Sequence, residues 1–175
     1  MSKKKKKLLL IDAIILIVLV ALDQITKYLA VMNLKGKAAI PIIKDVFELN
    51  YLENRGAAFG VLQNQKFFFL IISVVIVCAV VFVLYKVPDD KKYNQLHILL
   101  IMVASGGIGN MIDRIRFDYV VDFFSFVLIN FPIFNVADIY VTLSMIGLAI
   151  LILFVYKDED FNFLTLNRKK DSGEE

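Results

Sequence analysis

Four long apolar segments, separated by polar stretches, limit the folds that this chain can adopt. A helix that crosses the hydrocarbon core of a bilayer needs about 20 residues, within a range of about 17–25. Each segment is long enough for one crossing, so the sequence predicts four transmembrane helices. We expect these helices at about residues 8–30, 67–86, 95–113 and 135–156.

The composition agrees with a membrane protein and argues against other classes. Hydrophobic residues make up 59% of the 175 residues, against roughly 45–50% in a soluble globular domain. A soluble fold of this size could not cover so much apolar surface. The net charge of +3 gives no general case for nucleic-acid binding. We therefore expect a single integral membrane domain over residues 1–175, in contact with membrane lipids and not with nucleic acid.

The scarcity of cysteine and histidine narrows the available chemistry. Cys78 and His97 are the only residues of their kinds, which excludes an intramolecular disulfide and argues against a metal site built from cysteine or several histidines. We expect both residues to be structural, with Cys78 packed within the second helix. The chemistry must then come from carboxylates, amides or hydroxyls, and no metal or cofactor is expected.

The first apolar segment follows a basic run, Lys3–Lys7, and could be mistaken for a secretory signal peptide. No small-residue cleavage site closes the segment, and Asp23 and Lys27 stand where such a site would fall, so we expect a retained helix. As i,i+4 neighbours these two residues can form an ion pair on one helix face. An interfacial anchor is the alternative interpretation.

The distribution of lysine and arginine predicts the orientation in the membrane. Cytoplasmic segments carry an excess of these residues, so Lys3–Lys7 places the N-terminus inside. Four crossings then leave 12 of the 20 Lys and Arg residues on the cytoplasmic side. We expect both termini to be cytoplasmic, with a poorly ordered tail over residues 157–175. The loop over residues 33–66 is expected to be extracytoplasmic.

This topology gathers the unusual polar residues at the extracytoplasmic face. They are Asp23 and Lys27 in the first helix, Asn110, Asp113 and Arg114 in the third, Asp122 in the following connection, and Asn135 and Asp138 at the start of the fourth. Ionisable groups at membrane depth cost several kcal/mol, and they indicate a functional site by default.

The extracytoplasmic loop also contains a strand pattern. Apolar and polar side chains alternate over residues 46–52, and a period of two is typical of a strand. We expect a small sheet that residues 123–127 complete. The uncharged stretch over residues 123–137 contains Pro132 and is expected to return along the membrane surface. The predicted fold class is thus an all-α membrane protein with four transmembrane helices and a small extracytoplasmic β-sheet and loop subdomain.

Two carboxylates are candidates for chemistry. Asp122 lies in the apolar sequence VVDFF, and Asp138 begins the fourth helix in FNVAD. Two acids in one site tend to share a proton, so that the charged one can accept a proton from water while the neutral one donates to a carbonyl or an amine. Such a pair suits peptide hydrolysis without a covalent intermediate. Spacing alone leaves open that one is a plain loop acid and the other a plain helix-terminal acid.

Other polar residues could support this pair. The spacing of Asn135 and Asp138 places them on one helical face, and Asn110 and Arg114 share a face of the third helix. Asn110 needs a partner because it lies in an apolar helix. Asp113 could form an interfacial ion pair with Arg114.

Small residues mark two further segments. The glycines at positions 106–109 favour close packing of helices over a nucleotide-binding loop. Residues 53–60 read ENRGAAFG, where Asn54 offers an amide and Gly56 begins a run of small residues along which an extended peptide could lie. A plain tight loop is the alternative.

Taken in chain order, five of these segments resemble the motifs of the lipoprotein signal peptidase (signal peptidase II) family. The segments are DQITK at 23–27, NRGAAFG at 54–60, GGIGNMIDR at 106–114, VVDFF at 120–124 and FNVAD at 134–138. The resemblance covers residues 8–156, together with the plan of four spans and the chain length.

The resemblance implies a monomeric aspartic peptidase of the bacterial cytoplasmic membrane that needs no cofactor and is blocked by globomycin. It would remove the signal peptide of diacylglyceryl-modified prolipoproteins and cut before the lipidated cysteine. Asp122 and Asp138 would act as base and acid around one water. The family positions that bind substrate or order the site are Asn54, Gly56, Asn110, Arg114 and Asn135. The positions that the resemblance assigns to structural support are Asp23, Lys27 and Asp113.

Two other classes of function use the same residues. A small proton-coupled transporter could use the acids as a relay, although they cluster at one face and leave only Asp12 towards the other side. A membrane assembly factor without enzymatic activity is the second alternative.

Overall fold

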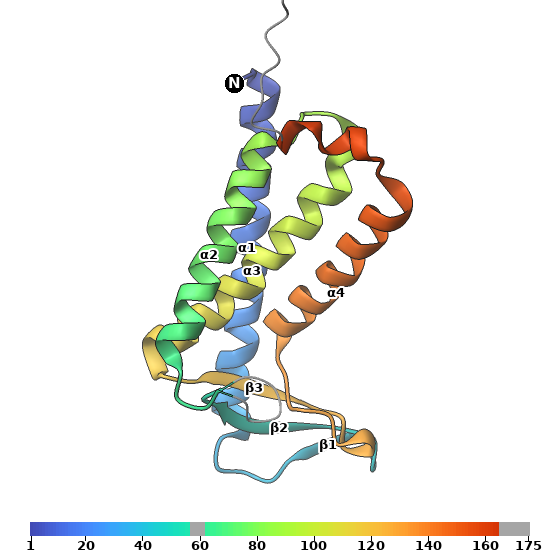
Figure 1. Cartoon of the computed structure of the whole chain (residues 1–175). Helices are drawn as coiled ribbons and strands as arrows, with labels where there is room; N and C mark the ends of the chain where they lie inside the picture. The colour runs from blue at the N-terminus through green and yellow to red at the C-terminus, as the bar shows by residue number, and fades with distance from the viewer. Residues whose placement is uncertain (57–61, 165–175) are drawn as a thin grey trace, which may run out of the picture.

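The structure is a computed structural model that describes residues 1–56 and 62–164. Within this part of the chain, four α-helices form a bundle, and a three-stranded sheet lies at the end opposite the N-terminus (Figure 1). The elements are α1 (Lys3–Leu34), β1 (Ile40–Ile43), β2 (Phe47–Asn54), α2 (Lys66–Lys86), α3 (Asn94–Phe117), β3 (Val120–Ser125) and α4 (Val136–Ile150). Shorter turns of 3-10 or π helix cover Lys91–Tyr93, Val127–Ile129, Leu151–Val155 and Asp158–Leu164.

The bundle exposes its apolar side chains and buries polar ones. Four helices among the described residues are long and apolar enough to cross a membrane. The buried residues of α1 are Lys5, Asp12, Asp23, Lys27, Ala30 and Leu34, whereas its side chains Ile14, Ile17 and Ile25 are exposed. This distribution suits a bilayer, in which lipid solvates the apolar surface and polar groups must find partners inside the protein. The predicted class of four membrane helices with a small sheet is confirmed.

The central helix is α3, which contacts α1, α2 and α4. A Cβ atom on Gly106 would overlap the carbonyl oxygen of Ala137 at the start of α4. A Cβ atom on Gly109 would overlap the carboxylate of Asp23 on α1. The close packing expected from these glycines is therefore confirmed. It places Asp23 of α1 and the first turn of α4 directly against α3.

The sheet brings the loop between α1 and α2 against the segment that follows α3. Its strand order is β1-β2-β3, with both pairings antiparallel. The register sets Leu52 opposite Asp122 and Asn54 opposite Val120. Because β3 is almost entirely buried, it carries Asp122 into the interior. The predicted sheet is confirmed, and its third strand begins at Val120 rather than at residue 123.

Two local expectations, for Cys78 and for the tail, are wrong. The expectation that His97 is structural is supported by a hydrogen-bond partner on α1. Cys78 is exposed on α2 rather than packed. The tail is not irregular from its start, because Asp158–Leu164 forms a 3-10 helix whose Asp160 carbonyl accepts a hydrogen bond from the hydroxyl of Tyr93; residues 165–175 lie outside the described residues. His97 is buried and structural, and its Nδ1 lies 2.7 Å from Oδ2 of Asp12 on α1.

We expect Gly106→Ala to lower the thermal unfolding temperature of the protein in detergent micelles by several degrees. The added methyl group would overlap backbone atoms of Ala137, which cannot move without shifting α4. Gly107→Ala is the matched control, since its Cβ would meet only Val77 Cγ2 at 3.9 Å, an ordinary contact. Equal unfolding temperatures for the two variants would contradict the close packing of α3 and α4.

Candidate active site

Asn135 and Asp138 together begin α4. Asn135 is the N-cap residue, and its Oδ1 accepts the backbone N–H of Asp138 at 3.0 Å. In return, Oδ2 of Asp138 accepts the backbone N–H of Asn135 at 3.1 Å, which completes a capping box. Asn135 therefore precedes the helix, and the expectation that it shares a helical face with Asp138 is wrong. The capping box holds the Asp138 carboxylate at the positive end of the helix dipole.

Asp122 lies on β3 and is only 1% exposed. Its two carboxylate oxygens accept hydrogen bonds from two amides, Asn54 Nδ2 at 2.8 Å and Asn135 Nδ2 at 2.6 Å. The Asn54 donor comes from the end of β2, two residues along the sheet from the Leu52–Asp122 pair. The oxygen of the Asn54 amide is occupied by the backbone N–H of Gly56 at 3.0 Å, so its NH₂ group faces Asp122.

Asn110 links the helices to Asp138. Its Nδ2 donates to Oδ1 of Asp138 at 2.8 Å, and its Oδ1 accepts from Asn135 Nδ2 at 3.1 Å and from Lys27 Nζ at 2.8 Å. The partners that an asparagine in an apolar helix requires are thus supplied by three residues, one from α1 and two from the start of α4.

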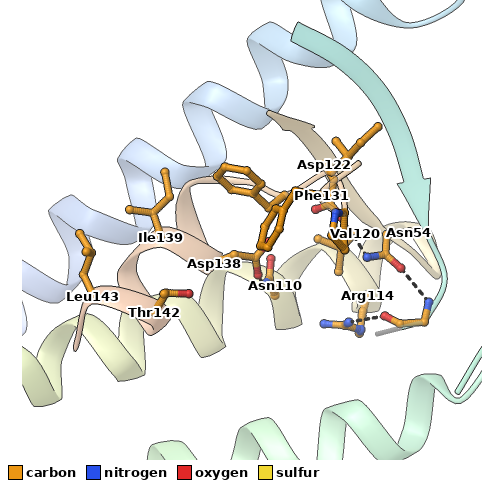
Figure 2. A pocket seen from close by; sticks show the side chains of 14 residues that line it. Asn54, Asn110, Arg114, Val120, Asp122, Phe131, Asp138, Ile139, Thr142 and Leu143 are labelled. Carbon is orange, nitrogen blue, oxygen red and sulfur yellow. Dashed lines mark hydrogen bonds between the residues drawn. The ribbon is translucent and has the colours of Figure 1, made fainter. Parts of the chain in front are cut away.

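A cavity of about 500 Å³ opens between these groups (Figure 2). Both Asp122 and Asp138 line it, with Asn54, Gly56, Asn110 and Arg114 contributing the rest of its polar wall. The apolar wall of the cavity consists of Val120, residues 131–134, Ile139 and Leu143, and Thr142 also lines it. Figure 2 shows that Asp138 and Asn110 lie close together near the middle of the cavity, with Asn54 and Arg114 towards one end.

The surroundings of Asp122 favour its protonated form more than water does. Burial, and after it the negative charge of Asp138, raise the pKa of Asp122 to about 7. The hydrogen bonds from Asn54 and Asn135 and the charge of Lys27 oppose this rise in the pKa. A carboxyl group that titrates near neutrality beside a second acid is the arrangement in which two acids share one proton.

Arg114 lies on the same face of α3 as Asn110, as the spacing predicts. Its Nη2 donates to the carbonyl oxygen of Gly56 at 3.3 Å, and its guanidinium lies 4.5 Å from the ring centroid of Phe69 on α2. Arg114 therefore ties the segment after β2 to the bundle. The rest of the NRGAAFG motif, residues 57–60, lies outside the described residues.

Asp23, Lys27 and Asp113 form a buried ion cluster behind the cavity. Lys27 Nζ lies 3.1 Å from a carboxylate oxygen of Asp23 and 3.1 Å from one of Asp113. The predicted Asp23–Lys27 pair is present, whereas Asp113 pairs with Lys27 and not with Arg114. The reason is that Asp113 projects from α3 towards α1, while Arg114 faces the cavity.

Gln24 is a member of this cluster that the sequence did not reveal. Its Nε2 donates to Asp23 Oδ2, to the carbonyl oxygen of Gly109 and to Asp113 Oδ1, at 3.0–3.2 Å. Its position between Asp23 and Lys27 in DQITK was the only available signal. Within the described residues, no group of three or more His, Cys, Asp or Glu side chains could hold a metal ion.

The sequence of this chain is similar to those of known membrane peptidases. A model of the family described as "Signal peptidase (SPase) II" matches residues 15–154. The chain is also 46% identical over 145 residues to the lipoprotein signal peptidase of Streptococcus thermophilus, which covers 83% of this chain and 92% of the relative. The chain belongs to the signal peptidase II family. The lipoprotein signal peptidase of Brevibacillus brevis is similarly 47% identical, over 81% of this chain and 91% of its own length.

Two solved structures of bacterial membrane enzymes, determined by the in meso method at 2.3 Å and 1.9 Å, have similar folds. Both match with a TM-score of 0.72. The first is 28% identical and covers 91% of this chain and 94% of its own; the second is 32% identical and covers 83% and 94%. The arrangement of four helices and a sheet is therefore that of a known membrane enzyme.

Membership of the signal peptidase II family decides between the classes of function. The chain is a bacterial membrane protein with lipoprotein signal peptidase activity, an aspartic peptidase that acts on prolipoproteins. The family and the peptidase activity expected from the five motifs are confirmed. The transporter and the assembly factor are set aside.

The pKa of Asp122 predicts how stability depends on pH. Because the folded-state pKa of about 7 exceeds the ordinary value of 3.8, protonation favours the folded state, and this contribution is lost as the pH rises through about 7. We expect the free energy of unfolding of the wild type, relative to Asp122→Asn, to fall by up to about 4 kcal/mol between about pH 4 and pH 8. Denaturant unfolding in micelles, followed by circular dichroism at each pH, measures this difference; a difference that stays constant with pH would contradict the assignment.

Proposed function

We propose that Asp122 and Asp138 are the catalytic dyad, and that they hydrolyse the peptide bond before the lipid-modified cysteine of a prolipoprotein. The observation that carries the proposal is that both carboxylates line one cavity and both accept a hydrogen bond from Asn135, Asp122 from its side-chain amide and Asp138 from its backbone N–H. An aspartic peptidase needs two carboxyl groups within reach of one water.

The surroundings of the two acids suggest a division of roles. Asp138 accepts hydrogen bonds from Asn110 and from the backbone N–H of Asn135 at a helix N-terminus, and we assign it the role of base. Asp122, with its raised pKa, then holds the shared proton at rest. In the reaction Asp138 accepts a proton from the attacking water while Asp122 donates to the carbonyl oxygen of the scissile bond. The resulting tetrahedral intermediate collapses when Asp138 gives the proton it took from water to the leaving amine and Asp122 takes back a proton from the hydroxyl that becomes the new carboxyl group.

The shape of the cavity supports a lipid-modified substrate. Its polar wall, with Asn54, Arg114 and the backbone of Gly56, offers donors and acceptors to an extended peptide. Its apolar wall reaches Leu143 of α4, which is 54% exposed on the membrane-facing side of the bundle. Diacylglyceryl chains attached to the cysteine can remain in the bilayer along α4 while the peptide enters the cavity.

We further propose a monomeric enzyme with both termini in the cytoplasm and its site at the extracytoplasmic face. The cavity and the sheet lie at the end of the bundle opposite the basic N-terminus (Figure 1). Because the positive charge of Lys3–Lys7 favours a cytoplasmic N-terminus, this arrangement supports an extracytoplasmic site.

Substitution of either acid tests the dyad. We expect Asp122→Asn and Asp138→Asn each to lower the rate of cleavage of a purified diacylglyceryl precursor by at least about 10²–10⁴-fold, because each removes one proton-transfer group. Membrane insertion should be retained, since asparagine has nearly the same shape as aspartate. Asp118→Asn, a change at an exposed acid of the same face, is the matched control and should cleave like the wild type.

The same assay tests the substrate class. An unlipidated precursor of the same sequence should be cleaved far more slowly than the diacylglyceryl form. Near wild-type turnover by either dyad variant would overturn the assignment of the catalytic residues. Equal cleavage of both precursors would overturn only the lipid requirement.

A further inference from the structure

A second pair of acids lies directly behind the proposed dyad. Asp23 on α1 and Asp113 on α3 are 0% and 1% exposed, and the ammonium of Lys27 bridges them at 3.1 Å from each. Buried carboxylates are costly unless their oxygens have several partners. The other partners of these two acids show what the cluster holds in place.

Each of the two acids accepts a backbone N–H from the residue immediately before a dyad residue. Oδ2 of Asp113 accepts the N–H of Val121 at 3.1 Å, next to Asp122. Oδ1 of Asp23 accepts the N–H of Ala137 at 3.0 Å, next to Asp138. The two backbone segments that carry the dyad, on β3 and at the start of α4, are thus each fixed to one acid of the cluster.

Lys27 connects these two attachments to each other and to the dyad. Its Nζ contacts Asp23 and Asp113 and also donates to Oδ1 of Asn110 at 2.8 Å. The amide of Asn110 consequently turns its NH₂ group towards the carboxylate of Asp138. A single ammonium group therefore contacts both backbone anchors and one hydrogen-bond donor of the dyad.

We infer that Lys27 is a positioning residue that sets the separation and orientation of the Asp122 and Asp138 carboxylates, through Asp113 and Val121 on one side and Asp23 and Ala137 on the other. This inference rests on the proposed function and adds a role to a group that would otherwise only hold helices together. Displacement of reacting groups by about 1 Å can cost about 10²-fold in rate, so a fixed separation has a direct catalytic consequence.

The Asp12–His97 pair gives a structural comparison within the same molecule. It also joins α1 to α3 through a buried hydrogen-bonded pair, at 2.7 Å, and it contacts neither dyad residue. Loss of this pair should affect folding without affecting the chemistry. It therefore separates the effect of joining the two helices from the effect of positioning the dyad.

The charge of Lys27 adds a second signature. The charged groups that face Asp122 are Asp138 on α4, Lys27 on α1 and Arg114 on α3. The positive charge of Lys27 lowers the pKa of Asp122. Without this charge the carboxyl of Asp122 should keep its proton to higher pH, and the alkaline fall in activity should shift upwards.

The experiment measures kcat, KM and their pH dependence for cleavage of a diacylglyceryl precursor by the full chain in micelles, per folded molecule. For Lys27→Met we expect kcat to fall about 10²-fold, with KM nearly unchanged. The alkaline fall in activity should shift to higher pH in this variant.

Asp113→Ala removes the acceptor of the Val121 N–H but leaves Lys27 paired with Asp23. Its kcat should fall, with no upward shift of the alkaline fall in activity. Asp12→Asn is the matched control, and it should lower thermal stability while keeping the wild-type kcat and pH profile.

The outcomes distinguish this inference from the proposed function. If the wild type does not cleave the precursor, the proposed function fails. If the wild type cleaves and folded Lys27→Met keeps its kcat and pH profile, the positioning role is overturned. Should Lys27→Met not fold, because it leaves two buried acids without a cation, Asp113→Ala decides: a wild-type kcat in that variant overturns the inference, and a reduced kcat at constant KM supports it.

Discussion

The pairing of two carboxylates with hydrogen-bond donors around one cavity is the constraint on which the rest of the structure depends. Asp122 is buried and Asp138 is half-buried, and three asparagine side-chain amides donate to them, together with the backbone N–H of Asn135. The oxygen of each amide accepts a hydrogen bond that fixes its orientation. The donors are the N–H of Gly56 for Asn54, the N–H of Asp138 for Asn135, and Lys27 for Asn110. Their NH₂ groups therefore all face the dyad, from β2, from the start of α4 and from α3.

The bilayer determines where such a site can be built. Lipid solvates the apolar outer surface of the helices, so polar side chains are directed inwards and must be paired there. At one end of α1 and α3 the pairing is a single hydrogen-bonded pair, Asp12 with His97. At the other end the cluster around Lys27 joins the same helices and also anchors the backbone beside Asp122 and Asp138. The buried polar groups at the cavity end of the bundle therefore fix the proposed dyad as well as the helices.

The sequence predicted the features that follow from local patterns. Apolar length gave the spans, alternation gave β2, and ordered motifs gave the family and the candidate acids. Contacts between distant segments were not predictable in this way. Neither Asp12 nor His97 is informative alone, since their pairing depends on how α1 packs against α3. Asn135 was misplaced in the helix because spacing cannot distinguish an N-cap from a first turn. The exposure of Cys78 depends on which face of α2 meets the lipid.

The central claim is that Asp122 and Asp138 form one proton-sharing pair. It is tested most directly by ¹³C NMR titration of the Asp122 carboxyl in labelled protein, assigned by its loss in Asp122→Asn. The account predicts a midpoint near pH 7 in the wild type and a lower midpoint in Asp138→Asn, because the neighbouring charge that raises the pKa is removed. A midpoint near the ordinary value of 3.8, unchanged in Asp138→Asn, would contradict it.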